Sequence, residues 1–234
     1  ERVALQAPTV DPSRLTCADG INAQKQVVGY WGFRFHNRVW AWGTSIGSVD
    51  LGLLSSSMNF AWARAINNHG LIVGDGLMAL PTYDPWGPGH RRDYRQRAFR
   101  ATVGGGLTDL GGPPQSDSSV AYGVNDAGDI VGAAWDVLGL PIGSPCTHRS
   151  AFLFQGGTWV DIGALAGSDT SEAFALNEAD QVVGVSGDLP FLWSPETGLE
   201  PLPTAGLPSC RPEAINEAEQ IVGVSHYGVQ GVQP

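Results

Sequence analysis

The chain is short of charge, and of basic charge in particular. Asp, Glu, Lys and Arg make up only 15% of its 234 residues, and the formal net charge is −10. A general nucleic-acid binder needs a net basic surface to neutralise phosphates, so we expect no nucleic-acid partner. No apolar run approaches the roughly 18 residues of a transmembrane helix, so the sequence predicts no membrane span.

Cysteine and histidine are scarce as well, with three and five residues. No two cysteines form a CxxC pair, which argues against a structural zinc site. Four of the histidines are predicted to lie on one face, but in different repeat units and too far apart to share an ion. We therefore expect no metal and no cofactor.

Glycine and proline are abundant, at 32 and 16 residues, which is typical of many short strands joined by tight turns. One eleven-residue pattern also occurs five times: an aliphatic residue, Asn, a polar stretch, two aliphatic residues and Gly. The five copies are DGINAQKQVVG (residues 19–29), RAINNHGLIVG (64–74), YGVNDAGDIVG (122–132), FALNEADQVVG (174–184) and EAINEAEQIVG (213–223). Internal repeats at this spacing indicate a repeat architecture.

Each repeat unit has the pattern of four antiparallel strands. The aliphatic residue before Asn ends one strand, the polar stretch forms a hairpin turn, and the residues before Gly begin the second strand. Aromatic-rich third strands are predicted at 38–42, 98–101, 151–154 and 190–193, and fourth strands at 49–52, 108–111, 160–163 and 199–202. Four strands in about 47 residues is typical of a β-propeller blade.

The sequence therefore predicts an all-β, five-bladed β-propeller that forms a single domain over residues 1–234. The fifth unit has two strands within 213–225 and a third within 227–232, but no fourth. We expect Val3, Ala4, Leu5 and Gln6 to supply it, so that strands from the N- and C-terminal ends pair in one blade and close the ring.

Two segments carry a family resemblance. Residues 121–132 followed by 151–163, and 173–184 followed by 191–202, pair an AxxINxxGxIVG-like motif with a downstream Phe-containing strand. This pairing resembles the bacterial extracellular repeat family named for its His-Ala-Phe (HAF) tripeptide, although the tripeptide itself is absent. The resemblance implies a β-propeller-like repeat protein that is secreted, and it implies no defined chemistry.

The variable loops between second and third strands gather histidine, arginine and aromatic residues on one face. Arg binds carboxylates and phosphates through paired donors, and aromatic rings stack on sugars or side chains. The alternative is that the longest loop packs over its own unit and pairs its arginines with Asp84 and Asp93. The predicted ligand-binding residues are Trp31, Arg34, His36, Arg38, Tyr83, Trp86, His90, Arg91, Arg92, Tyr94, Arg95, Trp135, His148 and Arg149.

Other recurring polar residues are expected to be structural. The five Asn occupy one turn position in every unit, and Asp50, Asp109 and Asp161 recur at one position before a Gly. Ser-rich joining loops could supply a nucleophile beside His90 or His148, but no GxSxG motif is present. We therefore predict no catalytic residue.

Cys17 and Cys210 lie at near-equivalent positions of the first and fifth units, which are neighbours in a closed ring. A Cys17–Cys210 disulfide would fasten the closure and leave Cys146 free. Pairings that involve Cys146 remain open, as does a protein with three free thiols.

These observations favour a secreted or periplasmic, non-catalytic binding or assembly module, since the chain also begins at Glu1 without Met. Its partner would be a protein, a glycan or an anionic ligand bound by the Arg, His and aromatic residues of the loops. One alternative is a polysaccharide lyase or hydrolase that uses His and Arg on the same face. Another is an accessory subunit of a larger complex.

Overall fold

The computed structural model describes residues 15–33, 36–56, 60–79, 94–136, 148–204, 206 and 209–225. These residues form strands, turns and bends, and they include no helix that could span a membrane. The strands are β1 (Leu15–Ile21), β2 (Val27–Phe33), β3 (His36–Gly43), β4 (Gly47–Gly52), β5 (Ala61–Ile66), β6 (Leu71–Ala79), β7 (Tyr94–Thr102), β8 (Thr108–Gly111), β9 (Ser118–Val124), β10 (Ile130–Trp135), β11 (Arg149–Gln155), β12 (Thr158–Gly163), β13 (Ser171–Leu176), β14 (Val182–Ser186), β15 (Leu189–Ser194), β16 (Gly198–Pro201), β17 (Cys210–Ile215) and β18 (Ile221–Ser225).

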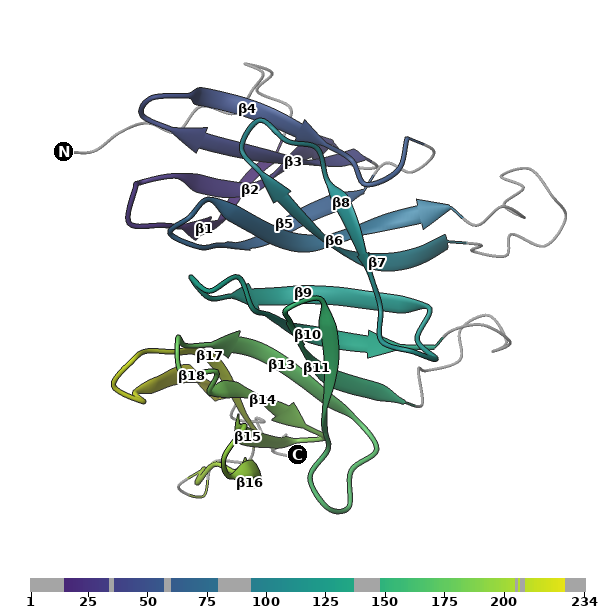
Figure 1. Ribbon diagram of the computed structural model, residues 1–234, viewed down its shortest axis with the longest axis vertical. Coiled ribbons are helices and arrows are strands. Elements are labelled where there is room, and N and C mark those ends of the chain that lie inside the picture. The colour runs from purple at the N-terminus through teal and green to yellow at the C-terminus, as the bar shows by residue number, and fades with distance from the viewer. Residues whose placement is uncertain are drawn as a thin grey trace, which may run out of the picture.

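The strands form four four-stranded antiparallel sheets and the two-stranded pair β17–β18, each in sequence order. The first strands of consecutive sheets, β1, β5, β9, β13 and β17, contact one another in turn. Each of them from β5 onward also packs against the second and third strands of the preceding sheet. From top to bottom of Figure 1, the sheet β1–β4 is followed by β5–β8, β9–β12 and β13–β16, and β17–β18 lies beside β13 and β14. The predicted all-β propeller of four-stranded blades is confirmed.

The Asn of each repeat closes the turn between the first two strands. The Asn67 Oδ1 accepts the backbone N–H of Leu71 at 2.8 Å and of His69 at 3.0 Å, which holds the turn in one conformation. The N–H of Asn67 also donates to the Leu71 carbonyl at 3.0 Å. Asn22, Asn125, Asn177 and Asn216 accept the N–H four residues later in the same way. The structural role predicted for the five Asn is confirmed.

The Gly that ends each repeat pattern allows two strands and an aromatic ring to meet. Gly132 pairs with Phe152 of β11, and a Cβ at Gly132 would lie 1.9 Å from the Val120 carbonyl oxygen and 2.8 Å from the Phe152 ring. Only a residue without a side chain fits there. The third-strand aromatic residues that lie beside these glycines are almost fully buried: Trp40, Phe99, Phe152 and Phe191.

The core lies between adjacent sheets. One cluster joins Val28 and Val39 of the first sheet to Ile72 and Phe99 of the second, and two further clusters fill the next two interfaces. Burying these side chains contributes about 25 cal/mol for each Å² of apolar surface removed from water. The sheets are therefore held to their neighbours in the chain by apolar packing.

A second recurring motif ends the fourth strand of three sheets. The Oδ1 of Asp161 accepts the N–H of Gly163 at 2.9 Å, and Asp50 and Asp109 make the same bond to Gly52 and Gly111. Each of these glycines has a positive φ, between 80° and 93°. The three aspartates are structural turn residues, as the sequence predicted.

Two expectations about ring closure have different outcomes. The terminal strands that were predicted to close the ring fall in residues 1–14 and 226–234, outside the described part of the chain. Cys17 and Cys210 are both free cysteines, so the predicted disulfide is absent. The physical reason is that, among the described residues, the first and last sheets do not pack against each other as consecutive sheets do, so β1 and β17 do not bring the two thiols together (Figure 1). Cys146 is not among the described residues, and the single-domain assignment stays a prediction.

Candidate functional site

The structure describes about half of the predicted ligand-binding set. Six of those residues and the side chain of one more lie outside the described part of the chain: Arg34, Tyr83, Trp86, His90, Arg91, Arg92 and the side chain of Tyr94. The described members come from three different sheets. His36 and Arg38 begin β3, Arg95 lies in β7, and Trp135, His148 and Arg149 flank the loop between β10 and β11.

Two of the described members help to hold the first sheet together. Trp31 is only 5% exposed and packs with Val27 and Trp40, so most of its ring is covered within the first sheet and little of it is left to contact a ligand. Strand β2 is covered on both faces, and a large apolar side chain there enters the core. Arg38 donates through Nε to the Asp50 carboxylate at 2.9 Å, which joins the third strand to the fourth.

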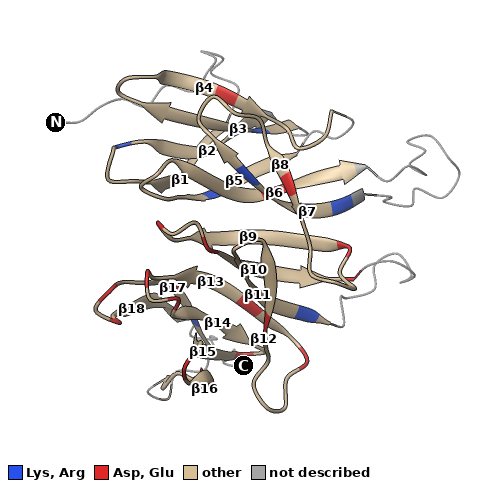
Figure 2. Cartoon of the chain, viewed as in Figure 1, with Lys and Arg blue, Asp and Glu red and all other residues tan. Residues whose placement is uncertain are grey.

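The arginines of the second and third sheets also have acidic neighbours. Arg95 Nε lies 4.0 Å from the Asp117 carboxylate. Arg149 Nη1 lies 2.9 Å from the Glu172 carboxylate, and its guanidinium stacks 4.3 Å from the centroid of the Trp135 ring. Figure 2 shows basic positions at the ends of β7 and β11, with acidic positions both on the same side of the molecule and at the turns on the opposite side. These side chains stabilise the fold and leave less charge for an anionic ligand.

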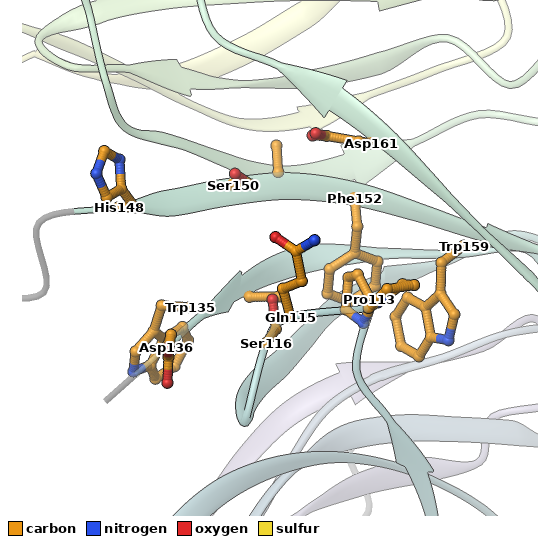
Figure 3. A pocket seen from close by; sticks show the side chains of 13 residues that line it. Pro113, Gln115, Ser116, Trp135, Asp136, His148, Ser150, Phe152, Trp159 and Asp161 are labelled. Carbon is orange, nitrogen blue, oxygen red and sulfur yellow. The ribbon is translucent and has the colours of Figure 1, made fainter. Parts of the chain in front are cut away.

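A cavity of about 460 Å³ opens beside β11 and is called here the β11 cavity. Its walls come from the connection between β8 and β9, from the end of β10, and from β11 and β12 (Figure 3). The volume is typical of a small-molecule site. The residues that line it include Pro113, Gln115, Ser116, Trp135, Asp136, His148, Ser150, Phe152, Trp159 and Asp161.

One end of the β11 cavity is aromatic. The Trp159 ring packs edge-on against Phe152 with centroids 4.8 Å apart, and it also contacts Phe154 at 4.7 Å. Phe152 is buried, whereas Trp159 is partly exposed toward the cavity. Figure 3 shows Phe152, Trp159 and Pro113 together at this end. An indole held by its neighbours offers a rigid apolar surface to a ring.

The other end and the middle of the cavity are polar. Trp135 and Asp136 lie together at this end, His148 lies apart from them at the start of β11, and Ser150 follows two residues later (Figure 3). His148 is exposed and makes no hydrogen bond to another described residue, so its ring nitrogens are available. No hydrogen bond links His148 to Ser150 within the described ranges, and a preformed Ser-His-Asp arrangement is therefore not present there.

The connection between β8 and β9 places Gln115 in the cavity. The N–H of Ser116 donates to the Pro113 carbonyl at 3.1 Å, which closes a tight turn around Pro114 and Gln115. Gln115 has a φ of 70°, a left-handed conformation that is uncommon for residues other than Gly. Its carboxamide projects into the middle of the cavity, toward β11 (Figure 3).

A second polar group of residues lies on the innermost strands. In every repeat, the residue three before Asn is skipped in the strand register, which is the mark of a β-bulge that redirects a side chain. In the second unit this residue is Arg64, which binds the fully buried Asp75 at 2.8 Å, and Gln96 Nε2 also donates to Asp75 at 2.7 Å. These bonds satisfy both carboxylate oxygens.

In the third unit the skipped residue is Tyr122, whose hydroxyl donates to Glu172 at 3.2 Å. Burial raises the pKa of the Tyr122 phenol to about 12, and the Glu172 carboxylate adds to this shift. The ring also contacts Phe174 edge-on at 5.4 Å. Both inner-strand groups are internally satisfied, so they are less available to a ligand than the residues of the β11 cavity. The described residues include no cluster of three His, Cys, Asp or Glu that could hold a metal ion.

Sequence reasoning found Trp135 and His148 but missed the residues that complete the cavity around them. Gln115, Asp136, Ser150 and Trp159 were not singled out. A signal for Gln115 was present, because the segment PPQSDSS in the third unit aligns with LAGSDTS in the fourth. Gly167 occupies the aligned position and also has a positive φ, 91°. The presence of Gln115 where the next unit has Gly is the sequence feature that could have identified this residue.

The comparisons with known proteins give structural neighbours only. No known family profile matches the chain, and no curated protein matches it. One similar solved structure is provisionally named a gluconolactonase, with 12% identity over 87% of this chain and 68% of that one, at a TM-score of 0.48. Another is a gluconolactonase from Xanthomonas campestris, with 13% identity over 90% of this chain and 84% of that one, at a TM-score of 0.36.

The names of these neighbours contradict the expected non-catalytic binding or assembly module, because both are names of hydrolases. Hydrolysis by this chain itself is a proposal. The likeness is too distant to transfer any site residue to this chain. The resemblance to the HAF repeat family finds no match among family profiles, whereas its coarser implication of a β-propeller-like fold is confirmed.

Proposed function

We propose that this chain hydrolyses small hydroxylated esters or lactones, and that the β11 cavity is its active site. The observation that carries the proposal is the composition of that cavity, in which the unbonded His148 and the Gln115 carboxamide share about 460 Å³ with an indole wall. A space of this size suits one sugar-sized ring better than a polymer chain. For that reason hydrolysis of a small substrate is favoured over cleavage of a polysaccharide.

The residues of the β11 cavity have different roles in the proposed reaction. Trp159, at the end of the cavity away from His148, supplies a flat surface for the apolar part of the substrate that is remote from the reacting carbonyl, and the Ser116 and Ser150 hydroxyls can bond to substrate hydroxyl groups. His148 acts as the general base, the commonest use of imidazole in catalysis. Asp161 is less suited to this role because its Oδ1 already accepts the N–H of Gly163.

In the first step a water oxygen attacks the ester carbonyl carbon while an imidazole nitrogen of His148 takes the water proton. The carbonyl electron pair moves onto oxygen and forms a tetrahedral intermediate. When that intermediate collapses, the bond from carbon to the alcohol oxygen breaks and the imidazolium returns its proton to this oxygen. The products are an acid and an alcohol, joined in one hydroxy acid when the substrate is a lactone. No oxidant and no cofactor are consumed.

The proposal is tested by acid release in a pH-stat, with glucono-δ-lactone, a γ-lactone of a sugar acid and p-nitrophenyl acetate as probes. We expect hydrolysis of at least one probe above the buffer rate. A His148→Ala variant should lose about 10²-fold or more in kcat, the usual contribution of a general base. His36→Ala is the matched control, because His36 is also exposed but begins β3, away from the cavity.

Two outcomes would overturn the proposal. The first is wild-type protein that hydrolyses none of the probes above the buffer rate. The second is full activity in the folded His148→Ala variant, which would place the chemistry elsewhere.

Membership of the HAF repeat family and an extracellular or periplasmic location remain further proposals. The membership is supported by the paired motifs at residues 121–132 and 151–163 and at residues 173–184 and 191–202, and the location by what that resemblance implies. Fractionation of the source cells, with an antibody against the chain, tests the location. Recovery of the chain in the cytosolic fraction would contradict it.

A further inference from the structure

We propose that Gln115 is a substrate-binding residue of the β11 cavity, whose carboxamide N–H donates to the carbonyl oxygen of the bound ester. The inference rests on the proposed hydrolase function and identifies the group that holds the reacting carbonyl. It starts from backbone conformation. Gln115 has a φ of 70°, where an L side chain is disfavoured and Gly is not.

The next repeat unit shows what this turn requires. Gly167 stands at the equivalent position with a φ of 91°, and Ser168 N–H donates to the Leu165 carbonyl as Ser116 N–H does to that of Pro113. The same turn therefore forms with Gly, at a lower conformational cost. Gln is therefore less favourable than Gly for the fold at this position. The presence of a side chain there needs a reason other than stability.

The Gln115 side chain has no structural partner to explain it. Its carboxamide makes no hydrogen bond with any residue that the structure describes, and the residue is exposed. The other three non-Gly residues with positive φ, Lys25, Asp180 and Glu219, all stand three residues after a repeat Asn, in turns closed by that Asn, whereas Gln115 does not. Two of the three also have side-chain partners. Asp180 accepts a bond from Gln155 Nε2 at 2.8 Å, and Glu219 accepts one from Gln181 Nε2 at 2.9 Å. Strained conformations without a structural partner concentrate at functional sites.

The direction in which the Gln115 side chain points indicates what it can bind. The Gln115 carboxamide projects into the cavity, with Ser150 and Asp161 across from it and the Trp159 ring to one side (Figure 3). A substrate bound in the cavity would lie within reach of the Gln115 carboxamide. Its N–H can then donate to the carbonyl oxygen and stabilise the negative charge that develops on this oxygen. Removal of one such donor typically costs 10²–10³-fold in kcat.

The test separates this role from a structural one. In Gln115→Gly we expect the melting temperature to stay unchanged or to rise by about 2–4 °C, because the strained conformation is relieved. In the same variant kcat should fall at least about 10²-fold. Gln115→Met keeps the length of the side chain but has no N–H, and it should lose the same activity.

The matched control is Gly167→Gln in the equivalent turn, where an added Cβ meets no atom within 4 Å. This change should lower the melting temperature by about 2–4 °C, because only the backbone strain is added. It should leave kcat unchanged.

The outcomes distinguish this inference from the proposed function. Wild-type protein without activity contradicts the hydrolase. Active wild type with full activity in Gln115→Gly and Gln115→Met contradicts the role of Gln115 alone. A large loss of melting temperature in Gln115→Gly would show that the side chain serves the fold, and would overturn the inference as well.

Discussion

The Asn67 side chain donates a 2.8 Å hydrogen bond from Nδ2 to the backbone carbonyl of Asn125, 58 residues later in the chain. The same bond joins Asn22 to Asn67, Asn125 to Asn177, and Asn177 to Asn216. One residue type therefore closes its own turn and links that turn to the next sheet. The series ends at Asn216, whose Nδ2 donates to Gln220 within its own turn.

The first prediction compares an internal Asn with the last one. Asn67→Ala removes the turn bonds and the link to the next sheet, and it leaves the Asn125 carbonyl without this donor. Asn216→Ala removes the turn bonds alone. We expect Asn67→Ala to lower the free energy of unfolding by about 1–3 kcal/mol more than Asn216→Ala does. Urea unfolding of both variants measures the difference, and equal losses would mean that the link between sheets contributes nothing.

The second prediction concerns the Gly at the end of the repeat pattern. A Cβ at Gly132 would lie 1.9 Å from the Val120 carbonyl oxygen, so Gly132→Ala must move backbone. We expect a loss of about 3 kcal/mol, the upper end of the usual cost of overpacking, in the free energy of unfolding. Gly106→Ala is the control, since no atom lies within 4 Å of a Cβ there, and it should be neutral within about 0.5 kcal/mol. A mild effect at Gly132 would contradict the close approach of the strands.

The third prediction concerns the buried ion pair of the second sheet. Arg64→Phe leaves the fully buried Asp75 carboxylate with Gln96 as its side-chain donor, which should cost about 3 kcal/mol in the free energy of unfolding. The fourth unit has Phe174 and Val185 at the two equivalent positions. The double variant Arg64→Phe/Asp75→Val should therefore recover most of the loss. Thermal unfolding of the three proteins decides this, and a double variant as unstable as the single one would contradict it.

The fourth prediction is a pH dependence that arises from Tyr122. Burial raises the pKa of this phenol from 10 to about 12, so the folded state holds the proton more tightly than the unfolded state. The stability contributed by the protonated phenol is complete below pH 10 and is lost as the pH rises from 10 to 12. The loss is on the order of 2 kcal/mol.

Tyr122→Phe should lack this part of the alkaline loss. Urea unfolding at pH 9 and pH 11.5 measures the difference between wild type and variant. Absorbance titration should also show one late phenol in wild type that the variant lacks. Parallel loss of stability in the two proteins between these pH values would contradict the shift.

Much of the fold could be predicted from the sequence because its determinants are local. The Asn bonds to the turn four residues ahead, and the Asp of each DLG-like motif bonds to the Gly two residues ahead. Such contacts repeat wherever the short motif repeats. The Gly beside each third-strand aromatic residue recurs for the same reason, and so the strands and their order within each sheet followed from the pattern.

The candidate site was predicted less well because it depends on which face of a strand is covered. Trp31 lies two residues and Trp135 three residues after the Gly of its repeat, so the two side chains point to opposite faces of their second strands. Trp31 packs into the core of the first sheet, whereas Trp135 forms part of a cavity wall and stacks against the Arg149 guanidinium. The arginines of β3 and β7 were predicted to bind a ligand. Arg38 is instead bonded to Asp50, a partner twelve residues away across a strand pair.

The sequence by itself determined a repeated β-strand unit, its turns and the residue that stabilises each turn, since those interactions lie within eleven residues. The tertiary structure decided where the open space lies. The β11 cavity draws Gln115, His148 and Trp159 from three separate segments. They come together because the third sheet packs against the chain that leads into it, and packing between sheets is fixed by the sum of many apolar contacts rather than by any short motif.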